Sequence, residues 1–129
     1  MAETIVKIEN LVKRYHELVA VDHFNLTVSK GEILGLLGPN GSGKTTTMNC
    51  LLSLLAYDKG SIEVFGKPMK PDSYDLKRNI GVVFQNVAVF DTLTVQENID
   101  YFCGLYIKDK KLRRQYVAEA GCVFGVFFF

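Results

Sequence analysis

Gly38-Pro39-Asn40-Gly41-Ser42-Gly43-Lys44-Thr45 is the stretch that decides how this sequence folds. It matches the pattern GxxxxGK[ST], in which glycines leave room for backbone N–H groups to approach and surround phosphate oxygens. The short apolar run at residues 33–37 precedes it, and apolar residues at helical spacing follow it over residues 44–55. We therefore predict a buried strand, a phosphate-binding loop and a helix, in that order.

The same stretch contains the side chains that this chemistry requires. Unpaired N–H groups and the positive end of the helix dipole attract phosphate to the start of the helix. Lys44 is expected to reach the β- and γ-phosphates as a point charge, and the Thr45 hydroxyl to ligate Mg²⁺. The alternative is a glycine-rich turn that only joins strand to helix. The matching flanks favour a nucleoside triphosphate site.

The rest of the chain has the pattern of a mixed α/β domain. Alternating or continuous apolar residues predict strands at residues 4–11, 23–28, 61–65 and 80–84. Thr94 and Glu97 have the spacing of a capping box, which predicts the start of a helix. One apolar stripe of that helix comprises Ile99, Phe102, Cys103 and Tyr106. A more charged helix is predicted at residues 108–120.

Composition excludes several classes of protein. The chain has 129 residues, 48% hydrophobic and 22% charged, which is typical of one soluble globular domain. Its net charge is +1 and the charges look scattered, which argues against nucleic acid as a partner. Three cysteines are too few for a disulfide framework and are expected to be reduced. No stretch approaches the roughly 20 apolar residues of a spanning helix.

Three segments of the sequence resemble consecutive landmarks of the ABC-family ATPases, in matching order and spacing. They are residues 15–22, 31–47 and 80–85. The resemblance implies an α/β fold: an incomplete P-loop NTPase core, an N-terminal antiparallel β subdomain and the start of the ABC helical subdomain. The motifs at residues 35–40 and 93–98 look most similar to bacterial exporters of drugs, peptides or polysaccharides.

The same resemblance implies a role for each site residue. Lys44 and Gln85 are the implied catalytic residues, and Thr45 and Gln85 the implied Mg²⁺ ligands. Tyr15 is implied to stack on adenine, a role that suits a flat amphipathic ring. The implied cofactors are ATP and Mg²⁺. The full nucleotide-binding set is Tyr15, Gly38, Pro39, Asn40, Gly41, Ser42, Gly43, Lys44, Thr45 and Thr46.

Partners and location follow from the family in the same way. A membrane-spanning transporter subunit is expected near residues 86–93 and the helix that follows them. A second ATP-binding subunit is expected to form a dimer with the full-length form. The protein is therefore expected in the cytoplasm, peripheral to the inner face of the cell membrane.

The resemblance ends before the family's second half. The sequence contains no LSGGQ-like signature, no apolar run ending in Asp-Glu and no later switch histidine, because His16 and His23 both precede the loop. We expect a truncated nucleotide-binding domain at residues 1–120 and an aberrant apolar tail at residues 121–129, from a frameshift or shortened reading frame. Half a site is expected to hold ATP but to hydrolyse it slowly.

Two hypotheses of different classes remain at this point, with a weaker third. The first is the ATPase subunit of a transporter, which needs the missing half. The second is a non-catalytic nucleotide-binding or interaction module, or the remnant of a transporter gene. The third, a small P-loop kinase, leaves Tyr15 and Gln85 as coincidences.

Overall fold

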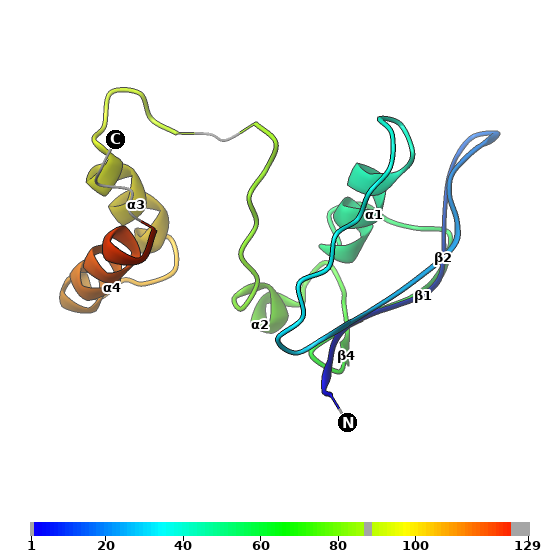
Figure 1. Ribbon diagram of the computed structural model, residues 1–129, viewed down its shortest axis with the longest axis horizontal. Helices are drawn as coiled ribbons and strands as arrows, with labels where there is room; N and C mark the ends of the chain where they lie inside the picture. The colour runs from blue at the N-terminus through cyan, green and yellow to red at the C-terminus, as the bar shows by residue number, and fades with distance from the viewer. Residues whose placement is uncertain (1, 87–88, 125–129) are drawn as a thin grey trace. The chain divides into compact units, whose positions relative to one another are not determined.

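The computed structural model describes residues 2–86 and 89–124 (Figure 1), with side chains described for residues 2–86 and 89–119. The chain divides between Ile80 and Gly81 into two compact units. The first unit contains every strand found in the described residues and the loop at residues 38–45. The second contains two helices.

A four-stranded antiparallel sheet forms the first unit, in the order β2-β1-β3-β4. Its strands are β1 (Thr4–Tyr15), β2 (Leu18–Ser29), β3 (Lys59–Val64) and β4 (Lys67–Pro68). β1 pairs with β2 and with β3, so that Ile8 lies opposite Leu26 on one side and Ile62 on the other. This confirms the antiparallel β subdomain. The predicted strands at residues 4–11 and 23–28 lie within β1 and β2, and the one at residues 61–65 overlaps β3 up to Val64.

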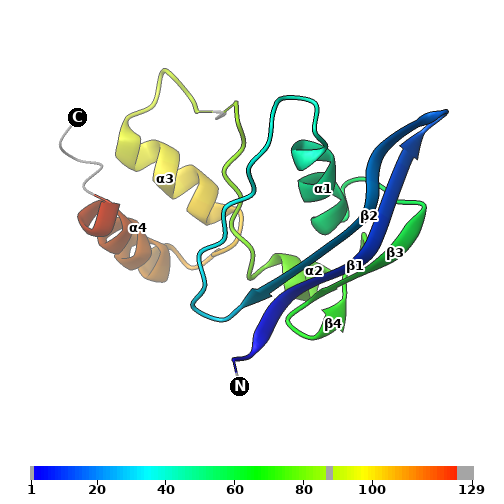
Figure 2. The same cartoon turned by 45° about the vertical axis from the view of Figure 1, so that its right-hand side comes forward.

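The core of the first unit lies between this sheet and the helix after the loop. That helix, α1 (Lys44–Leu51), lies along one face of the strands (Figure 2) and contributes Cys50 to the core. A short helix, α2 (Tyr74–Lys77), contributes Leu76. Burial raises the pKa of the Cys50 thiol, as expected for a reduced cysteine acting as a small apolar side chain. The buried cluster consists of Ile8, Leu11, Val21, Cys50, Ile62, Val64, Met69 and Leu76.

Two segments predicted as buried strands are not strands in the structure. Residues 33–37 and 80–84 have irregular backbone, and Ile33 and Leu37 are 99% and 93% exposed. A strand is stabilised by a neighbour whose backbone groups pair with its own. In residues 2–86 and 89–124, no strand pairs with either segment. The predictions of a central strand at residues 33–37 and of a buried strand at residues 80–84 were therefore wrong, although the composition of both segments is apolar.

The second unit contains α3 (Val95–Gly104) and α4 (Lys110–Phe124), which pack against each other. Both were predicted, and α3 begins where the capping box places it. Of the predicted apolar stripe, Phe102 is exposed on α3, and Tyr106 is exposed beyond the end of the helix at Gly104. No described helix is long and apolar enough to cross a membrane. Of the predicted tail, residues 125–129 lie outside the described residues.

Candidate nucleotide-binding site

The loop at residues 38–45 leads directly into α1. Gly43 precedes the helix with φ 93°, and no side chain caps the first turn. The leading N–H groups of α1 are therefore free of side-chain partners and open to an anion. A Cβ added at Gly43 would lie 2.5 Å from the Ala20 carbonyl oxygen, so both the backbone angle and the packing require glycine.

The Lys44 side chain folds back over the loop. Its ammonium group donates hydrogen bonds to the Gly38 carbonyl, to the Pro39 carbonyl at 2.8 Å and to the Ser42 hydroxyl at 3.4 Å. These contacts place a full positive charge above the backbone of the loop. Phosphate oxygens carry more negative charge than carbonyl oxygens and would compete for the same ammonium group. The geometry therefore agrees with an anion-binding role for Lys44.

A cavity of about 490 Å³ adjoins the loop. This volume falls in the range of small-molecule sites, about 300–1,000 Å³. Thr47 is buried at its wall, with its hydroxyl donating to the Gly43 carbonyl at 2.8 Å. The strand β2 contributes the opposite wall of the cavity. This wall was not predicted from the sequence, because the motif does not specify which strand faces the loop. The lining residues are Val19, Ala20, Val21, Asp22, Phe24, Leu36, Leu37, Gly38, Pro39, Ser42, Gly43, Lys44 and Thr47.

The other predicted site residues lie at three places. Thr45 and Thr46 occupy the first turn of α1, where Thr45 is exposed. Tyr15 ends β1 with 43% of its surface exposed, and the Lys13 ammonium lies 5.0 Å from its ring centroid. Tyr15 is not among the residues that line the cavity. Gln85 is exposed and belongs to the second unit.

The residues of the first unit suit the phosphates of ATP better than they suit a metal ion without nucleotide. The uncapped start of α1 and the Lys44 ammonium both attract phosphate. In the described part of the chain, no group of three or more His, Cys, Asp and Glu could hold a metal ion. A magnesium ion would therefore take the Thr45 hydroxyl from this unit and most of its ligands from phosphate and water.

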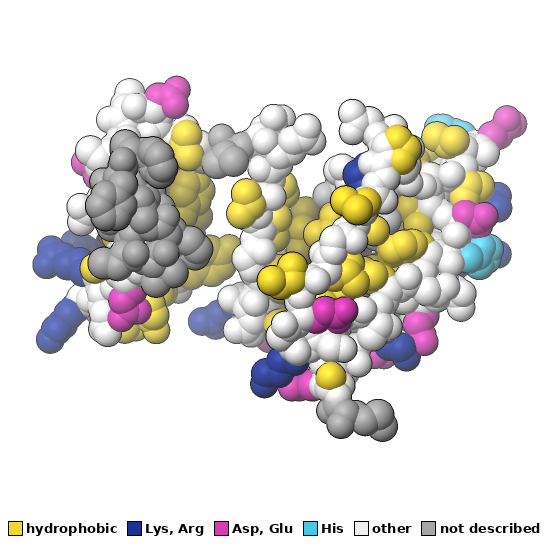
Figure 3. All heavy atoms as spheres, in the orientation of Figure 1, with side chains coloured by type: hydrophobic (Ala, Val, Ile, Leu, Met, Phe, Trp, Pro, Cys, Tyr) yellow, Lys and Arg dark blue, Asp and Glu magenta, His cyan; other side chains and the backbone are white. Residues whose placement is uncertain are grey.

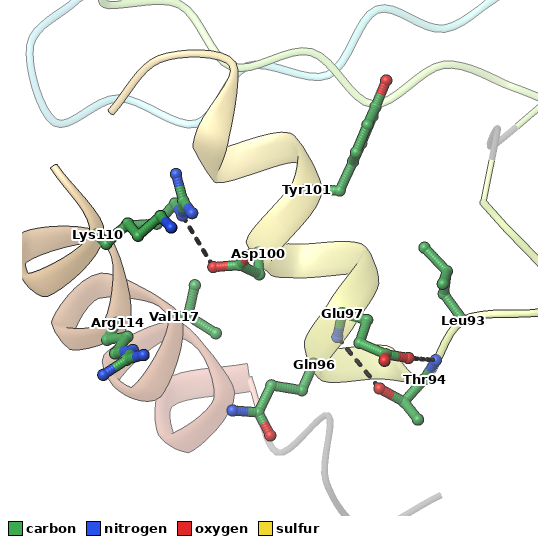
Figure 4. A pocket seen from close by; sticks show the side chains of 10 residues that line it. Leu93, Thr94, Gln96, Glu97, Asp100, Tyr101, Lys110, Arg114 and Val117 are labelled. Atoms are coloured by element: carbon green, nitrogen blue, oxygen red, sulfur yellow. Dashed lines mark hydrogen bonds and ion pairs between the residues drawn. The ribbon is translucent and has the colours of Figure 1, made fainter. Parts of the chain in front are cut away.

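The second unit carries an ordered loop before α3. The Thr94 hydroxyl accepts from the Glu97 N–H at 3.2 Å, and the Glu97 carboxylate accepts from the Thr94 N–H at 2.7 Å (Figure 4), which confirms the capping box. The Asn98 side-chain oxygen accepts a hydrogen bond from the Phe90 N–H at 2.8 Å, and its NH₂ group donates to the Phe90 carbonyl at 3.1 Å. Sequence reasoning missed Asn98, although its place four residues after the cap was a usable signal.

Together, the loop, its lysine and the helix that follows define a P-loop nucleotide-binding domain. The comparison with protein families matches residues 21–123 to the model "ABC transporter". The chain therefore belongs to the ABC transporter family. This confirms the resemblance seen in the sequence and the partial P-loop NTPase fold.

Curated relatives share a third or more of the aligned residues. The chain is 33% identical over 124 residues to the probable multidrug ABC transporter ATP-binding protein YbhF of Escherichia coli, covering 96% of this chain and 22% of that protein. It is 40% identical over 96 residues to the bacitracin transport ATP-binding protein BcrA of Bacillus licheniformis, covering 74% and 31%. The chain thus spans less than a third of these two relatives.

Solved structures agree on the fold. The chain matches cbiO1 from Clostridium perfringens, described as part of the ABC transporter complex cbiONQ, with TM-score 0.80, 24% identity and coverage of 95% and 51%. It matches the ATP-binding cassette MJ0796, solved as a dimer bound to ADP and Pi, with TM-score 0.70, 27% identity and coverage of 89% and 55%. About half of each neighbour's length therefore corresponds to this chain.

Proposed function

We propose that this chain binds ATP at the loop of residues 38–46 and contributes the N-terminal part of a transporter's nucleotide-binding domain. The observation that carries the proposal is the uncapped start of α1 beneath the Lys44 ammonium, which together form a cationic cradle for phosphate. In this proposal Thr45 and Gln85 contact Mg²⁺, Lys44 and Gln85 serve catalysis in the complete site, and Tyr15 stacks on adenine.

Hydrolysis by these residues alone is proposed to be slow. The loop and Lys44 bind and orient the phosphates and offset their charge. The sequence supplies no Asp-Glu pair after an apolar run and no later switch histidine. Catalysis of phosphoryl transfer depends on a positioned water and on charge stabilisation from all sides. Binding without steady turnover is therefore the expected behaviour. A non-catalytic nucleotide-binding module, the second candidate, predicts the same result even when transporter subunits are added.

The proposed setting is a transporter complex at the inner face of the membrane, in the cytoplasm. The partners are a membrane-spanning subunit and a second ATP-binding subunit, and the direction is export. The proposed direction rests on the motifs at residues 35–40 and 93–98. Among the relatives, the osmoprotectant import ATP-binding protein OsmV of Salmonella typhimurium, 42% identical over 121 residues, represents the opposite direction. Residues 1–120 are proposed as the domain and residues 121–129 as a separate apolar tail.

Calorimetric titration with Mg·ATP, with phosphate release followed on the same sample, tests this function. Saturable binding without release supports the proposal. Steady turnover would mean that a catalytic base exists elsewhere in the chain. Folded protein that fails to bind ATP would overturn the nucleotide site.

Matched lysine variants show whether any binding uses the loop. Lys44→Ala is expected to weaken ATP binding about 10- to 100-fold, since a charge-assisted contact to phosphate is lost. Lys70→Ala removes an exposed lysine that lies outside the cavity and should leave affinity unchanged. Equal affinity in both variants would contradict the role of Lys44. Tyr15→Ala should weaken ATP more than inorganic triphosphate, because only ATP carries a base to stack.

A further inference from the structure

Positive charge is concentrated in one short segment of the second unit. Residues 108–114 contain five of the 15 lysines and arginines but one of the 14 acidic residues. This segment therefore has a net charge of +4, and the rest of the chain has −3. The sequence-based view that charges are scattered was thus wrong at this segment. The five cations are Lys108, Lys110, Lys111, Arg113 and Arg114.

Two charges of this segment already have structural partners. The Arg113 guanidinium donates to Asp100 at 2.9 Å and is only 19% exposed, so it joins α3 to α4. The Asp109 carboxylate accepts from the N–H groups of Lys111 and Leu112 at 2.8 and 3.2 Å, so it caps α4. Neither group is free to meet a partner.

The other four cations are exposed and have no ion-pair partner among the described residues. They are Lys108, Lys110, Lys111 and Arg114. Figure 4 shows Lys110 and Arg114 on α4, beside the ion pair of Asp100. In Figure 3, dark-blue side chains project outward from the region of α4. Glu97 and Asp100 line the same pocket as Lys110 and Arg114. The four cations nevertheless remain exposed and outside the printed ion pairs of the described residues.

Exposed apolar and aromatic side chains flank these cations. Leu105 and Tyr106 precede them with 64% and 65% of their surface exposed, and Leu112 and Tyr116 follow with 42% and 47%. Tyrosine has an apolar body and a polar tip, which suits the boundary between lipid headgroups and acyl chains. Lysine and arginine can keep their charged ends among the headgroups while their stems cover apolar surface.

We propose that this basic edge, comprising Leu105, Tyr106, Lys108, Lys110, Lys111 and Arg114, binds directly to the surface of an anionic lipid bilayer. The contact is additional to the proposed nucleotide site and needs no membrane-spanning subunit. The net charge of +4 on residues 108–114 is attracted to an anionic surface. Exposed tyrosine and leucine beside the cations favour a lipid surface over a nucleic acid.

Co-sedimentation of the purified chain with vesicles tests this proposal. Vesicles of phosphatidylcholine alone are compared with vesicles that also contain phosphatidylglycerol, without nucleotide, at low and near-physiological salt. Binding is expected only to the anionic vesicles and should weaken with salt, because the attraction is screened over about 8–10 Å. Equal binding to neutral vesicles, or no binding to anionic ones, would overturn the proposal. Either result leaves the ATP titration unaffected.

Two quadruple variants distinguish binding by this local site from an effect of net charge. The first replaces Lys108, Lys110, Lys111 and Arg114 with Gln. It should weaken binding by up to a few hundredfold, since each cation near an anionic surface contributes about fivefold. The control replaces the exposed Lys30, Lys59, Lys67 and Lys70 with Gln, which changes the net charge equally. The control should bind more strongly than the first variant, with circular dichroism confirming that both are folded.

Two results would contradict the lipid assignment. Equal loss of vesicle binding in the two quadruple variants would mean that total charge alone is responsible. The second result is displacement of the protein from anionic vesicles by duplex DNA. If DNA did so as effectively as lipid at equal concentration of negative charge, and through the same four residues, the site would be a general polyanion site. Vesicle binding that depends on these residues and survives competition by DNA supports the proposal.

Discussion

The strand β1 and the segment at residues 33–37 are both rich in apolar residues, but the structure treats them in opposite ways. In β1, Ile8 and Leu11 are 1% and 0% exposed. In the second segment, Ile33 and Leu37 are almost fully exposed. β1 has strands on both sides and α1 over one face, whereas no described strand pairs with residues 33–37. Apolar composition alone therefore does not determine burial.

This comparison shows what an apolar run requires before it can become a buried strand. The free energy gained from hydrophobic burial is roughly proportional to the apolar area that neighbours cover. A strand also depends on neighbours whose backbone groups pair with its own. β1 obtains both from β2, which follows it in the sequence, and from β3, which begins only at Lys59. Residues 33–37 obtain neither from the described part of the chain. Such exposed runs also favour aggregation.

Truncation of one leucine in each of these regions should give the largest difference in stability. Leu11→Ala removes a fully buried side chain and should lower the free energy of unfolding by about 2–5 kcal/mol. Leu37→Ala removes one that is 93% exposed and should change it by less than about 0.5 kcal/mol. Urea denaturation measures both. A comparable loss in Leu37→Ala would show that residues 33–37 are covered in solution.

Gly43 and Gly35 lie near the loop but differ in what an added Cβ would meet. Gly43→Ala places a residue with a Cβ at φ 93°, against the Ala20 carbonyl, and should cost about 1–2 kcal/mol for the backbone angle alone. It should also abolish ATP binding by displacing the loop. Gly35→Ala meets no atom within 4 Å and should be close to neutral. Thermal melts and ATP titration of both variants measure the difference, and similar behaviour would refute the loop geometry.

In the second unit, α3 begins with a capping box and has no buried residue among those described. Thr94→Ala should therefore cost α3 about 1 kcal/mol, because little packing compensates for a lost cap. Thr94→Ser keeps the hydroxyl and should recover most of the helix. Amide hydrogen exchange along α3 reports the effect. Unchanged exchange in Thr94→Ala would mean that packing, rather than the cap, holds the helix.

The smallest expected effect is a dependence of α3 on pH. Hydrogen bonding to the Thr94 backbone and then to its side chain lowers the pKa of Glu97. A lowered folded pKa stabilises the helix above the unfolded value of about 4.3, and this contribution is lost as pH falls through the folded value. The loss of protection below about pH 4.3 should be absent in Glu97→Gln. An identical pH profile in that variant would assign the effect to another group.

Local sequence patterns predicted a large part of the fold and the site. The alternation at residues 4–11 and the capping box at Thr94 each depend on near neighbours, and both were confirmed. The loop and the start of α1 were also placed correctly. α1 ends at Leu51, earlier than the spacing to Leu55 predicted, and Ser53 follows with φ 55°. The roles of Tyr15 and Gln85 stay predictions.

Long-range features were less accessible to sequence reasoning. The wall that β2 adds to the cavity depends on a strand pairing that no short motif encodes. The ion pair between Asp100 and Arg113 likewise depends on two helices packing together. This ion pair occupies Arg113, whereas the other cations of residues 108–114 have no ion-pair partner among the described residues. The amino-acid sequence alone does not distinguish Arg113 from its neighbours.

The sequence by itself determined the glycine-rich loop at residues 38–45 and the helix that begins at Lys44, because glycine freedom and helix formation are local properties of adjacent residues. It also determined the family. Only the tertiary structure decided which apolar runs are buried, because burial needs neighbours that lie far away in the chain. It likewise decided which cations meet carboxylates and which face outward, because both depend on how α3 and α4 pack.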